Sequence, residues 1–176
     1  MVIHPAIDGS LQLRAENRLT GDQIDRIDLR VHPLVLELTG KKAPRTGLES
    51  KFSISHAVAA AMVYGHVGEP EFSDQAVRDP AVVALRDRVG ATVDQAIGED
   101  QVRIAVVLKD GRRLEKFIEH AIGSASNPMT DAQLEAKFKL LAGGVLPADR
   151  VAQIIDFCWN LEHAAAAAQL ARLAVA

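Results

Sequence analysis

Cysteine, aromatic residues and net charge are all scarce in this chain of 176 residues. The one cysteine, Cys158, excludes an intramolecular disulfide and any metal site built from several cysteines, and it suits a reducing cytoplasm. Aromatic residues make up 4% of the sequence, too few for a platform that stacks on single-stranded nucleic acid. The net charge of -3 gives no general attraction to phosphate backbones. We therefore expect a cytoplasmic protein without a nucleic-acid partner.

Membrane-directing segments and common catalytic signatures are also missing. The first residues lack the basic and apolar regions of a signal peptide, and no apolar run approaches the roughly 20 residues that span a bilayer. The chain contains no dinucleotide-binding or phosphate-binding glycine loop and no nucleophile elbow. Its histidines show no His-x-x-x-His spacing. The sequence therefore predicts no membrane partner and no metal site.

What is present has the patterning of a folded α+β protein. Hydrophobic residues make up 48% of the chain and charged residues 24%, which is an ordinary globular composition. Apolar residues four apart predict a helix over residues 4–17. Alternating apolar residues predict a strand over residues 24–31, which Pro33 ends because proline cannot donate to a β-ladder. Residues 40–50 are rich in turn formers and indicate a polar connection.

The clearest signal for a buried helix covers residues 53–64. Ser53 or Ser55 can cap its first N–H groups, and Gly65 suits its end. Two shorter helices are predicted after it, over residues 73–79 and 80–89.

A β-hairpin gives the clearest strand signal. Residues 102–108 alternate, Asp110-Gly111 forms the turn, and residues 114–120 return. Asp-Gly supplies the positive φ angles that a type I′ turn requires. A short strand at residues 91–94 precedes the hairpin. One face of the hairpin needs cover, and we expect the helix over residues 53–64 to provide it.

Helices dominate the rest of the chain. Thr130 and Gln133 form a capping box, which predicts the start of a helix. A second helix is predicted over residues 151–161, with Cys158 on its core face, and a tail helix begins near Glu162.

These elements indicate an α+β fold, with a small antiparallel sheet packed against helices and a helical extension after it. We expect the α+β domain to cover residues 1–122. We expect residues 123–176 to form C-terminal helices that pack on a helical domain absent from this chain or on a partner chain.

Five segments, taken in order, resemble one protein family. They are His4-Pro5-Ala6-Ile7-Asp8; Thr46-Gly47-Leu48-Glu49-Ser50-Lys51-Phe52-Ser53 with the alanine-rich helix and Gly65; Phe72-Ser73 with Asp79-Pro80-Ala81-Val82; Asp110-Gly111-Arg112 with Asn127-Pro128-Met129-Thr130; and Leu134-Glu135-Ala136-Lys137-Phe138. Because the segments occur in register over nearly all of the chain, the sequence resembles the C-terminal part of the MmgE/PrpD family.

The resemblance implies a cofactor-free lyase of the 2-methylcitrate dehydratase type, with a small polycarboxylic acid as substrate. Members look like homodimers whose subunits combine a large helical domain with a smaller α+β lid. The present chain resembles the lid plus the last helices, which return to the helical domain. The implied chemistry removes a proton next to a carboxylate and then expels water or carbon dioxide, or returns the proton. Most residues credited with that chemistry lie in the part that this chain lacks.

His56 is the leading candidate for a catalytic residue. It lies at the start of the helix over residues 53–64, where the positive end of the helix dipole disfavours an imidazolium. A neutral imidazole can act as an acid or a base near pH 7. The resemblance implies that this position faces the active site. The alternative is a histidine tucked under a loop or capping the helix, and the sequence favours neither.

Three further residues are weaker candidates. His4 is a second catalytic candidate, because the resemblance places it near the cleft between domains. Lys51 and Arg45 are candidates for substrate binding, since a lysine or an arginine can pair with a carboxylate. For each of the three, a solvated surface position is the simpler interpretation.

Two other functions stay open at this point. One is a stand-alone, non-catalytic module that forms homo-oligomers, because the apolar faces of the helices after residue 130 must pack on something. The other is an inactive fragment of a longer enzyme.

Overall fold

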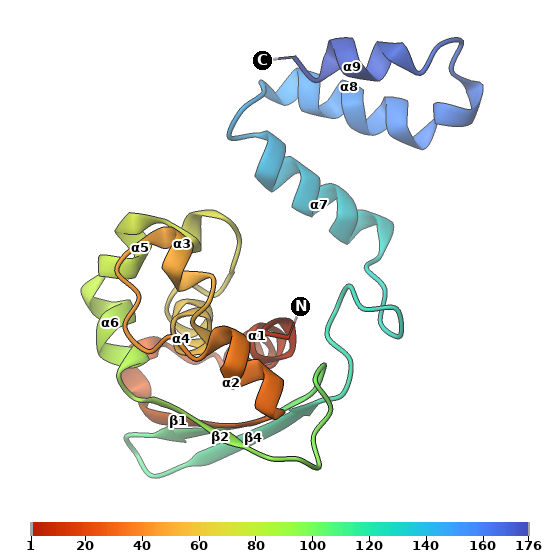
Figure 1. The fold of residues 1–176 in the computed structure, drawn as a ribbon. Coiled ribbons are helices and arrows are strands. Elements are labelled where there is room, and N and C mark those ends of the chain that lie inside the picture. Colours follow the sequence, from red (N-terminus) through yellow and green to blue (C-terminus); the bar gives the residue numbers. More distant parts are fainter. Residues whose placement is uncertain (1, 176) are drawn as a thin grey trace. The chain divides into compact units, whose positions relative to one another are not determined.

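A four-stranded sheet organises the first part of the chain in the computed structural model, which describes residues 2–175 (Figure 1). The strands are β1 (Ile24–Val31), β2 (Val89–Val93), β3 (Val102–Leu108) and β4 (Arg113–Ile118), in the order β2-β1-β3-β4. Together with the helices around it, this sheet confirms the α+β class. β1 pairs antiparallel with β3 but parallel with β2, so the sheet is mixed, where the sequence predicted an antiparallel one. The parallel pair arises because the chain crosses over through several helices before β2.

Helix α1 (His4–Asn17) covers the β3–β4 hairpin. The approach is close at Gly9, where an added Cβ would lie 2.6 Å from Cδ1 of Ile104 and 2.9 Å from Cγ1 of Ile118. The prediction that the helix over residues 53–64 covers this hairpin is therefore wrong. The physical reason is the glycine, which lets α1 approach where a longer side chain would hold it away.

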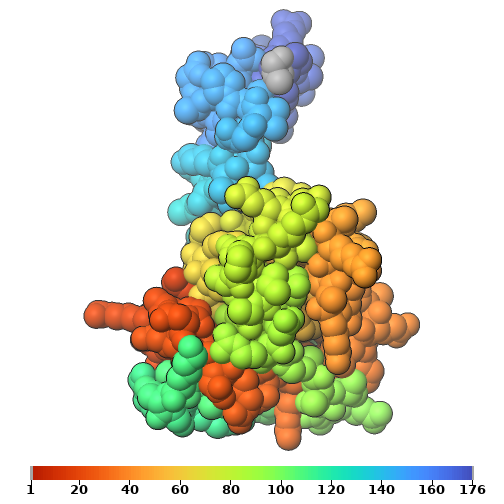
Figure 2. All heavy atoms as spheres, turned by 90° about the vertical axis from the view of Figure 1, so that its left-hand side faces the viewer, coloured from red at the N-terminus to blue at the C-terminus, as the bar shows by residue number. Residues whose placement is uncertain are grey.

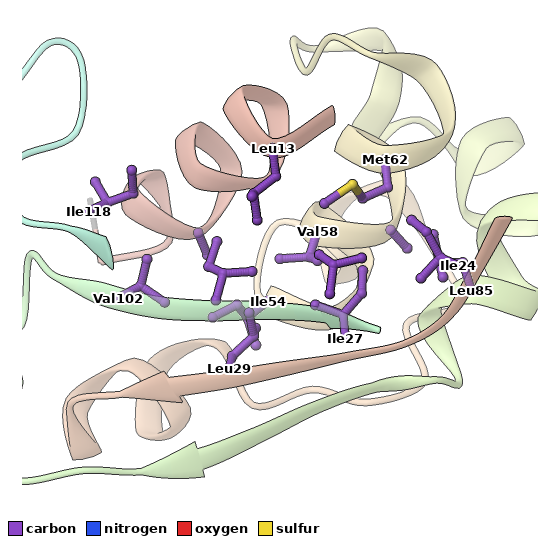
Figure 3. Packing of buried hydrophobic residues seen from close by; sticks show 14 of the residues in the cluster. Leu13, Ile24, Ile27, Leu29, Ile54, Val58, Met62, Leu85, Val102 and Ile118 are labelled. Atoms are coloured by element: carbon purple, nitrogen blue, oxygen red, sulfur yellow. The ribbon is translucent and has the colours of Figure 1, made fainter. Parts of the chain in front are cut away.

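Helix α4 (Ile54–Tyr64) packs instead above β1 and against α1, α6 and β2 (Figure 3). Figure 3 shows Val58 and Met62 of α4 pointing toward Ile24 and Ile27 of β1. These side chains belong to one buried cluster that joins both helices to the sheet. The predicted caps are confirmed: the Ser53 hydroxyl accepts the His56 N–H at 3.2 Å, and Gly65 ends the helix with a φ of 79°.

The crossover between β1 and β2 contains more helix than the sequence suggested. Besides α4, its elements are α2 (Pro33–Thr39), α3 (Gly47–Ser50), the 3-10 turn η2 (Pro70–Phe72), α5 (Asp74–Arg78) and α6 (Pro80–Arg86). Pro33 does follow the end of β1, but it also begins α2, which the sequence analysis missed. Proline fits the first helical position because its missing N–H has no partner there, and His32 caps the helix by accepting the Leu34 N–H at 3.2 Å. Helix α6 ends at Arg86, earlier than predicted, because β2 already begins at Val89.

The turn of the hairpin differs from the predicted type. Gly111 has a φ of 89°, but Asp110 does not share the positive φ that a type I′ turn needs, since Arg18 is the only such non-glycine residue between residues 2 and 175. The Gly111 N–H donates to the Leu108 carbonyl at 2.9 Å, and the Leu108 N–H donates to the Arg112 carbonyl at 2.8 Å. This is a three-residue loop with glycine at its left-handed position.

The chain divides after Pro128 into two compact units, and the second consists of helices. They are α7 (Asp131–Ala142), α8 (Ala148–Trp159), a 3-10 turn η3 (Leu161–His163) and α9 (Ala168–Leu173). The capping box of Thr130 and Gln133 is confirmed. Leu146, Val151 and Ile154 form a small core of this unit. The tail helix is shorter than predicted, because extended backbone at Ala164 separates η3 from α9.

Cys158 does not occupy the predicted core position. Its side chain is exposed, beside an apolar hollow that Phe138 and Trp159 also line. The small core of this unit buries Val151 and Ile154 of α8 but leaves Cys158 and Trp159 of the same helix exposed. No helix within residues 2–175 is long and apolar enough to cross a membrane.

Candidate functional site

His56 lies in the first turn of α4, at the third helical position after the Ser53 cap. Its side chain is fully buried, with 0% of its surface exposed. The segment η2 lies over it: the Phe72 ring is 5.8 Å from the imidazole, centroid to centroid, with the two planes tilted by 50°. The histidine is therefore enclosed within the first unit and does not open to solvent in this structure.

The hydrogen bonds of His56 define which nitrogen holds the proton. Nε2 lies 2.8 Å from the backbone carbonyl oxygen of Glu71, which can only accept, so Nε2 is the donor. In the neutral ring Nδ1 is then an acceptor, and it finds no hydrogen-bond partner among the described residues. The ring thus combines a fixed donor with an unused, buried acceptor.

The surroundings of His56 lower its pKa below the ordinary value of 6.5. Burial is the largest cause, because it disfavours the charged imidazolium, and the positive charge of Arg86 acts in the same direction. The hydrogen bond to the Glu71 carbonyl opposes both. The ring is consequently neutral near pH 7, with a lone pair on Nδ1 that can accept a proton.

Glu71 holds the segment above the histidine in place. Its side chain is 8% exposed. One carboxylate oxygen accepts the Gly68 N–H at 2.7 Å, and the other lies 3.1 Å from Nε2 of His66. The same residue therefore fixes η2 through its side chain and orients His56 through its carbonyl.

Lys51 and Arg45 lie on the surface at either end of α3. The Lys51 ammonium pairs with Glu69 at 2.6 Å. Arg45 donates its backbone N–H to Glu49 at 2.7 Å, and Glu49 also pairs with Lys41 at 2.9 Å. These contacts hold the pKa of Glu49 below its usual range, the Arg45 N–H acting most strongly. Figure 2 shows the segment of residues 40–50, which includes α3, in orange beside the yellow-green surface formed by α5 and α6.

The four predicted site residues do not form one cluster. His56, Lys51 and Arg45 come from one stretch of chain, but His56 is buried whereas the other two are exposed. His4 is exposed at the first position of a different helix, α1. Catalytic roles for His56 and His4 and binding roles for Lys51 and Arg45 stay predictions. Among residues 2–175, no group of three histidine, cysteine or acidic side chains is placed to hold a metal ion.

Arg86 is a functional candidate that the sequence analysis missed. It is 8% exposed, and its Nη1 donates to the Val77 carbonyl at 3.3 Å. Its Nε is buried and has no hydrogen-bond partner among the described residues. A signal was present in the sequence: Val82, Leu85 and Arg86 have the three- and four-residue spacing of a single helical face, so the apolar face of α6 includes the arginine.

The fold and this site together define an α+β domain that encloses a buried, neutral histidine. The sequence profile described as the MmgE/PrpD C-terminal domain matches residues 1–161. The chain belongs to the MmgE/PrpD family, and this result confirms the resemblance on which the sequence analysis relied.

Curated relatives agree with this assignment. The chain is 25% identical over 157 residues to the 2-methylcitrate dehydratase of Salmonella typhimurium, an alignment that covers 82% of this chain and 32% of the relative. It is 26% identical over 156 residues to the cis-aconitate decarboxylase of mouse, covering 86% of this chain and 32% of that protein. A cis-aconitate decarboxylase-like protein of Aspergillus oryzae is 26% identical over 173 residues, an alignment that covers 93% of this chain and 36% of that protein. The chain thus spans about a third of the length of these relatives.

Proposed function

We propose that this chain is the C-terminal portion of a lyase that acts on small polycarboxylic acids. The proposed reaction removes a proton next to a carboxylate and expels water or carbon dioxide, or returns the proton. The names of the relatives, a dehydratase and a decarboxylase, support this class of chemistry. In this proposal residues 1–122 form the lid, residues 123–176 pack on a helical domain, and the enzyme is a cytoplasmic homodimer that needs no cofactor.

One observation carries the proposal at the level of residues. His56 is neutral, its Nε2–H is fixed by the Glu71 carbonyl, and its Nδ1 has no partner among the described residues. A buried acceptor without a partner is costly for a fold, so a role in proton transfer explains its presence. Contact between this ring and substrate requires η2 to shift in the complete enzyme, as lid segments do when a site closes.

The test is a His56→Gln variant of the complete enzyme, assayed on 2-methylcitrate and cis-aconitate. The Gln amide can still donate to the Glu71 carbonyl, but it cannot serve as a base, so kcat should fall by about 100-fold or more while the melting temperature changes little. His120→Gln is the matched control and should keep wild-type kinetics. Unchanged kcat in a folded His56→Gln enzyme contradicts the catalytic role.

A second candidate function, a stand-alone module that forms homo-oligomers, is favoured by the surface of the C-terminal unit. Several large apolar side chains there are exposed: Leu134, Leu140, Leu141, Val145, Trp159 and Leu161. Exposed apolar side chains in such number commonly mark an interface, and either a helical domain or a second copy of the chain can cover them.

A further inference from the structure

A hollow of about 460 Å³ opens in the first unit, near but distinct from the enclosed ring of His56. Its wall combines the segment after α2, the first turn of α4, the end of α6 and the start of β2. The polar side chains that line it are Lys42, Ser55, Arg86 and Asp87.

Arg86 is the feature of this hollow that points to a ligand. Arg86 is more than nine-tenths buried, yet its side chain forms no ion pair with an acidic side chain within the described residues. Its Nε lacks a hydrogen-bond partner among them as well. A buried cation without a counter-charge is strongly unfavourable, and a bound anion removes that cost.

The first turn of α4 adds hydrogen-bond donors to the same hollow. Ile54 and Ser55, the first two residues of this 11-residue helix, both line it. Their N–H groups have no acceptor within the helix, since only later residues reach a carbonyl four positions back. The Ser53 hydroxyl is engaged by the His56 N–H, which leaves the first two N–H groups available. The positive end of the helix dipole therefore faces the hollow that Arg86 lines.

The charges at the rim of the hollow favour an anion. Lys42 is exposed and adds a second cation. Asp87 is exposed at the end of α6 and is the one acidic residue of the lining, so it opposes anion binding in part. Two cations and one carboxylate leave a net positive charge, which is compatible with one bound carboxylate group.

We propose that this hollow binds one carboxylate group of a small acid, with Arg86 and Lys42 as the cations and Ser55 and the first N–H groups of α4 as donors. The inference rests on the proposed function for the choice of a carboxylic acid over other anions. It identifies binding residues other than Lys51 and Arg45, which lie exposed on the surface. A guanidinium is well matched to this task because it can donate two parallel hydrogen bonds to a carboxylate.

The experiment is a calorimetric titration of the 176-residue chain with citrate, at constant ionic strength set with sodium chloride. Saturable binding at one site per chain is expected, weakened at least 10-fold in Arg86→Gln and about three-fold in Lys42→Gln and Ser55→Ala. Asp87→Asn should bind citrate more tightly, because it removes the opposing charge. Arg78→Gln, at an exposed arginine of α5, is the matched control and should bind as the wild type does.

Three results would overturn the proposal. They are an absence of saturable citrate binding, wild-type binding in both Lys42→Gln and Ser55→Ala, and inorganic sulfate that competes for the site with equal or higher affinity. The last result would assign the hollow to oxyanions in general. If Arg86→Gln fails to fold, the other two variants still decide the question. Both Lys42 and Ser55 line the hollow, and neither substitution removes an apolar core side chain.

The titration measures no turnover, so its outcome is independent of the test of His56. If the chain binds citrate and the His56→Gln enzyme is active, the carboxylate site is supported and the catalytic role of His56 is rejected. If His56→Gln is inactive and the chain does not bind citrate, the catalytic role is supported and the carboxylate site is rejected.

Discussion

At the scale of the residue, burial decides the properties of two polar side chains, His56 at the start of α4 and Arg86 at the end of α6. His56 and Arg86 each have a nitrogen without a hydrogen-bond partner among the described residues. The positive charge of Arg86 disfavours protonation of His56, in addition to the effect of burial. Arg86 therefore helps to keep His56 in the neutral form that the proposed chemistry needs.

The lowered pKa of His56 makes the fold sensitive to acid. In the unfolded chain the histidine titrates near 6.5, whereas the folded ring takes up its proton only at a lower pH. Between these two pH values the unfolded state binds more protons, so the free energy of unfolding falls as pH decreases below about 6.5. Urea unfolding at several pH values should show a smaller loss between pH 7.5 and 5 in His56→Gln than in the wild type. His163→Gln, at an exposed position, should keep the wild-type dependence, and an identical slope in all three proteins would contradict the prediction.

Individual residues show which features could be predicted from the sequence and which could not. Ser53, Gly65 and Thr130 were predicted correctly because caps and left-handed positions depend on a few neighbouring residues. The burial of Arg86 was missed, because it depends on which face of α6 meets the rest of the domain. The spacing placed Arg86 on the apolar face of α6, but an arginine at the end of a short helix can also extend into solvent.

At the scale of the element, contacts between distant segments explain the remaining errors. The sequence predicted the strands of the hairpin but assigned its cover to the wrong helix, since nothing in α4 excludes that position. The deciding residue is Gly9 of α1, which is too small to appear in an apolar pattern. The parallel pairing of β1 with β2 was likewise unpredictable from local alternation, because the length of a crossover does not specify the partner of an edge strand.

The close contact at Gly9 predicts that Gly9→Ala destabilises the first unit. The added methyl group would overlap Cδ1 of Ile104, and overpacking of this kind typically costs about 1–3 kcal/mol, more than the gain in helix propensity. Ile104→Val removes Cδ1, so Gly9→Ala should cost less in that background. A double-mutant cycle from chemical denaturation measures the difference. Equal costs in both backgrounds would show that the helix, and not the side chain, adjusts.

At the scale of the whole molecule, the chain has two units that differ in how well they bury their apolar residues. The first unit encloses a large core between its sheet and helices. The second has a core of three buried residues and leaves many of its large apolar side chains exposed. A helical unit of this kind depends on further contacts for its stability.

The exposed apolar residues predict that the chain alone associates with itself at micromolar concentration. Sedimentation velocity should detect a dimer or larger species, and Leu134→Glu together with Leu141→Glu should shift the population to monomer, because charges on an apolar interface are unfavourable. Ala132→Glu, at an exposed position on the opposite side of the same helix, is the control and should leave association unchanged. A wild-type chain that is strictly monomeric would exclude the homo-oligomeric module.

The order of strands in the sheet has a consequence for how the first unit reaches its native state. β3 and β4 are joined by a three-residue loop, and a β-hairpin of this kind forms within about 1–10 μs. β2 is separated from its only partner, β1, by the whole crossover, and closing so long a loop is entropically unfavourable until α4 and α6 are in place. Folding is therefore expected to proceed from the hairpin outward, with β2 joining last. The hollow proposed to bind a carboxylate is lined by β2 and by the end of α6, which carries Arg86. We therefore expect this hollow to be completed only in the final step of folding.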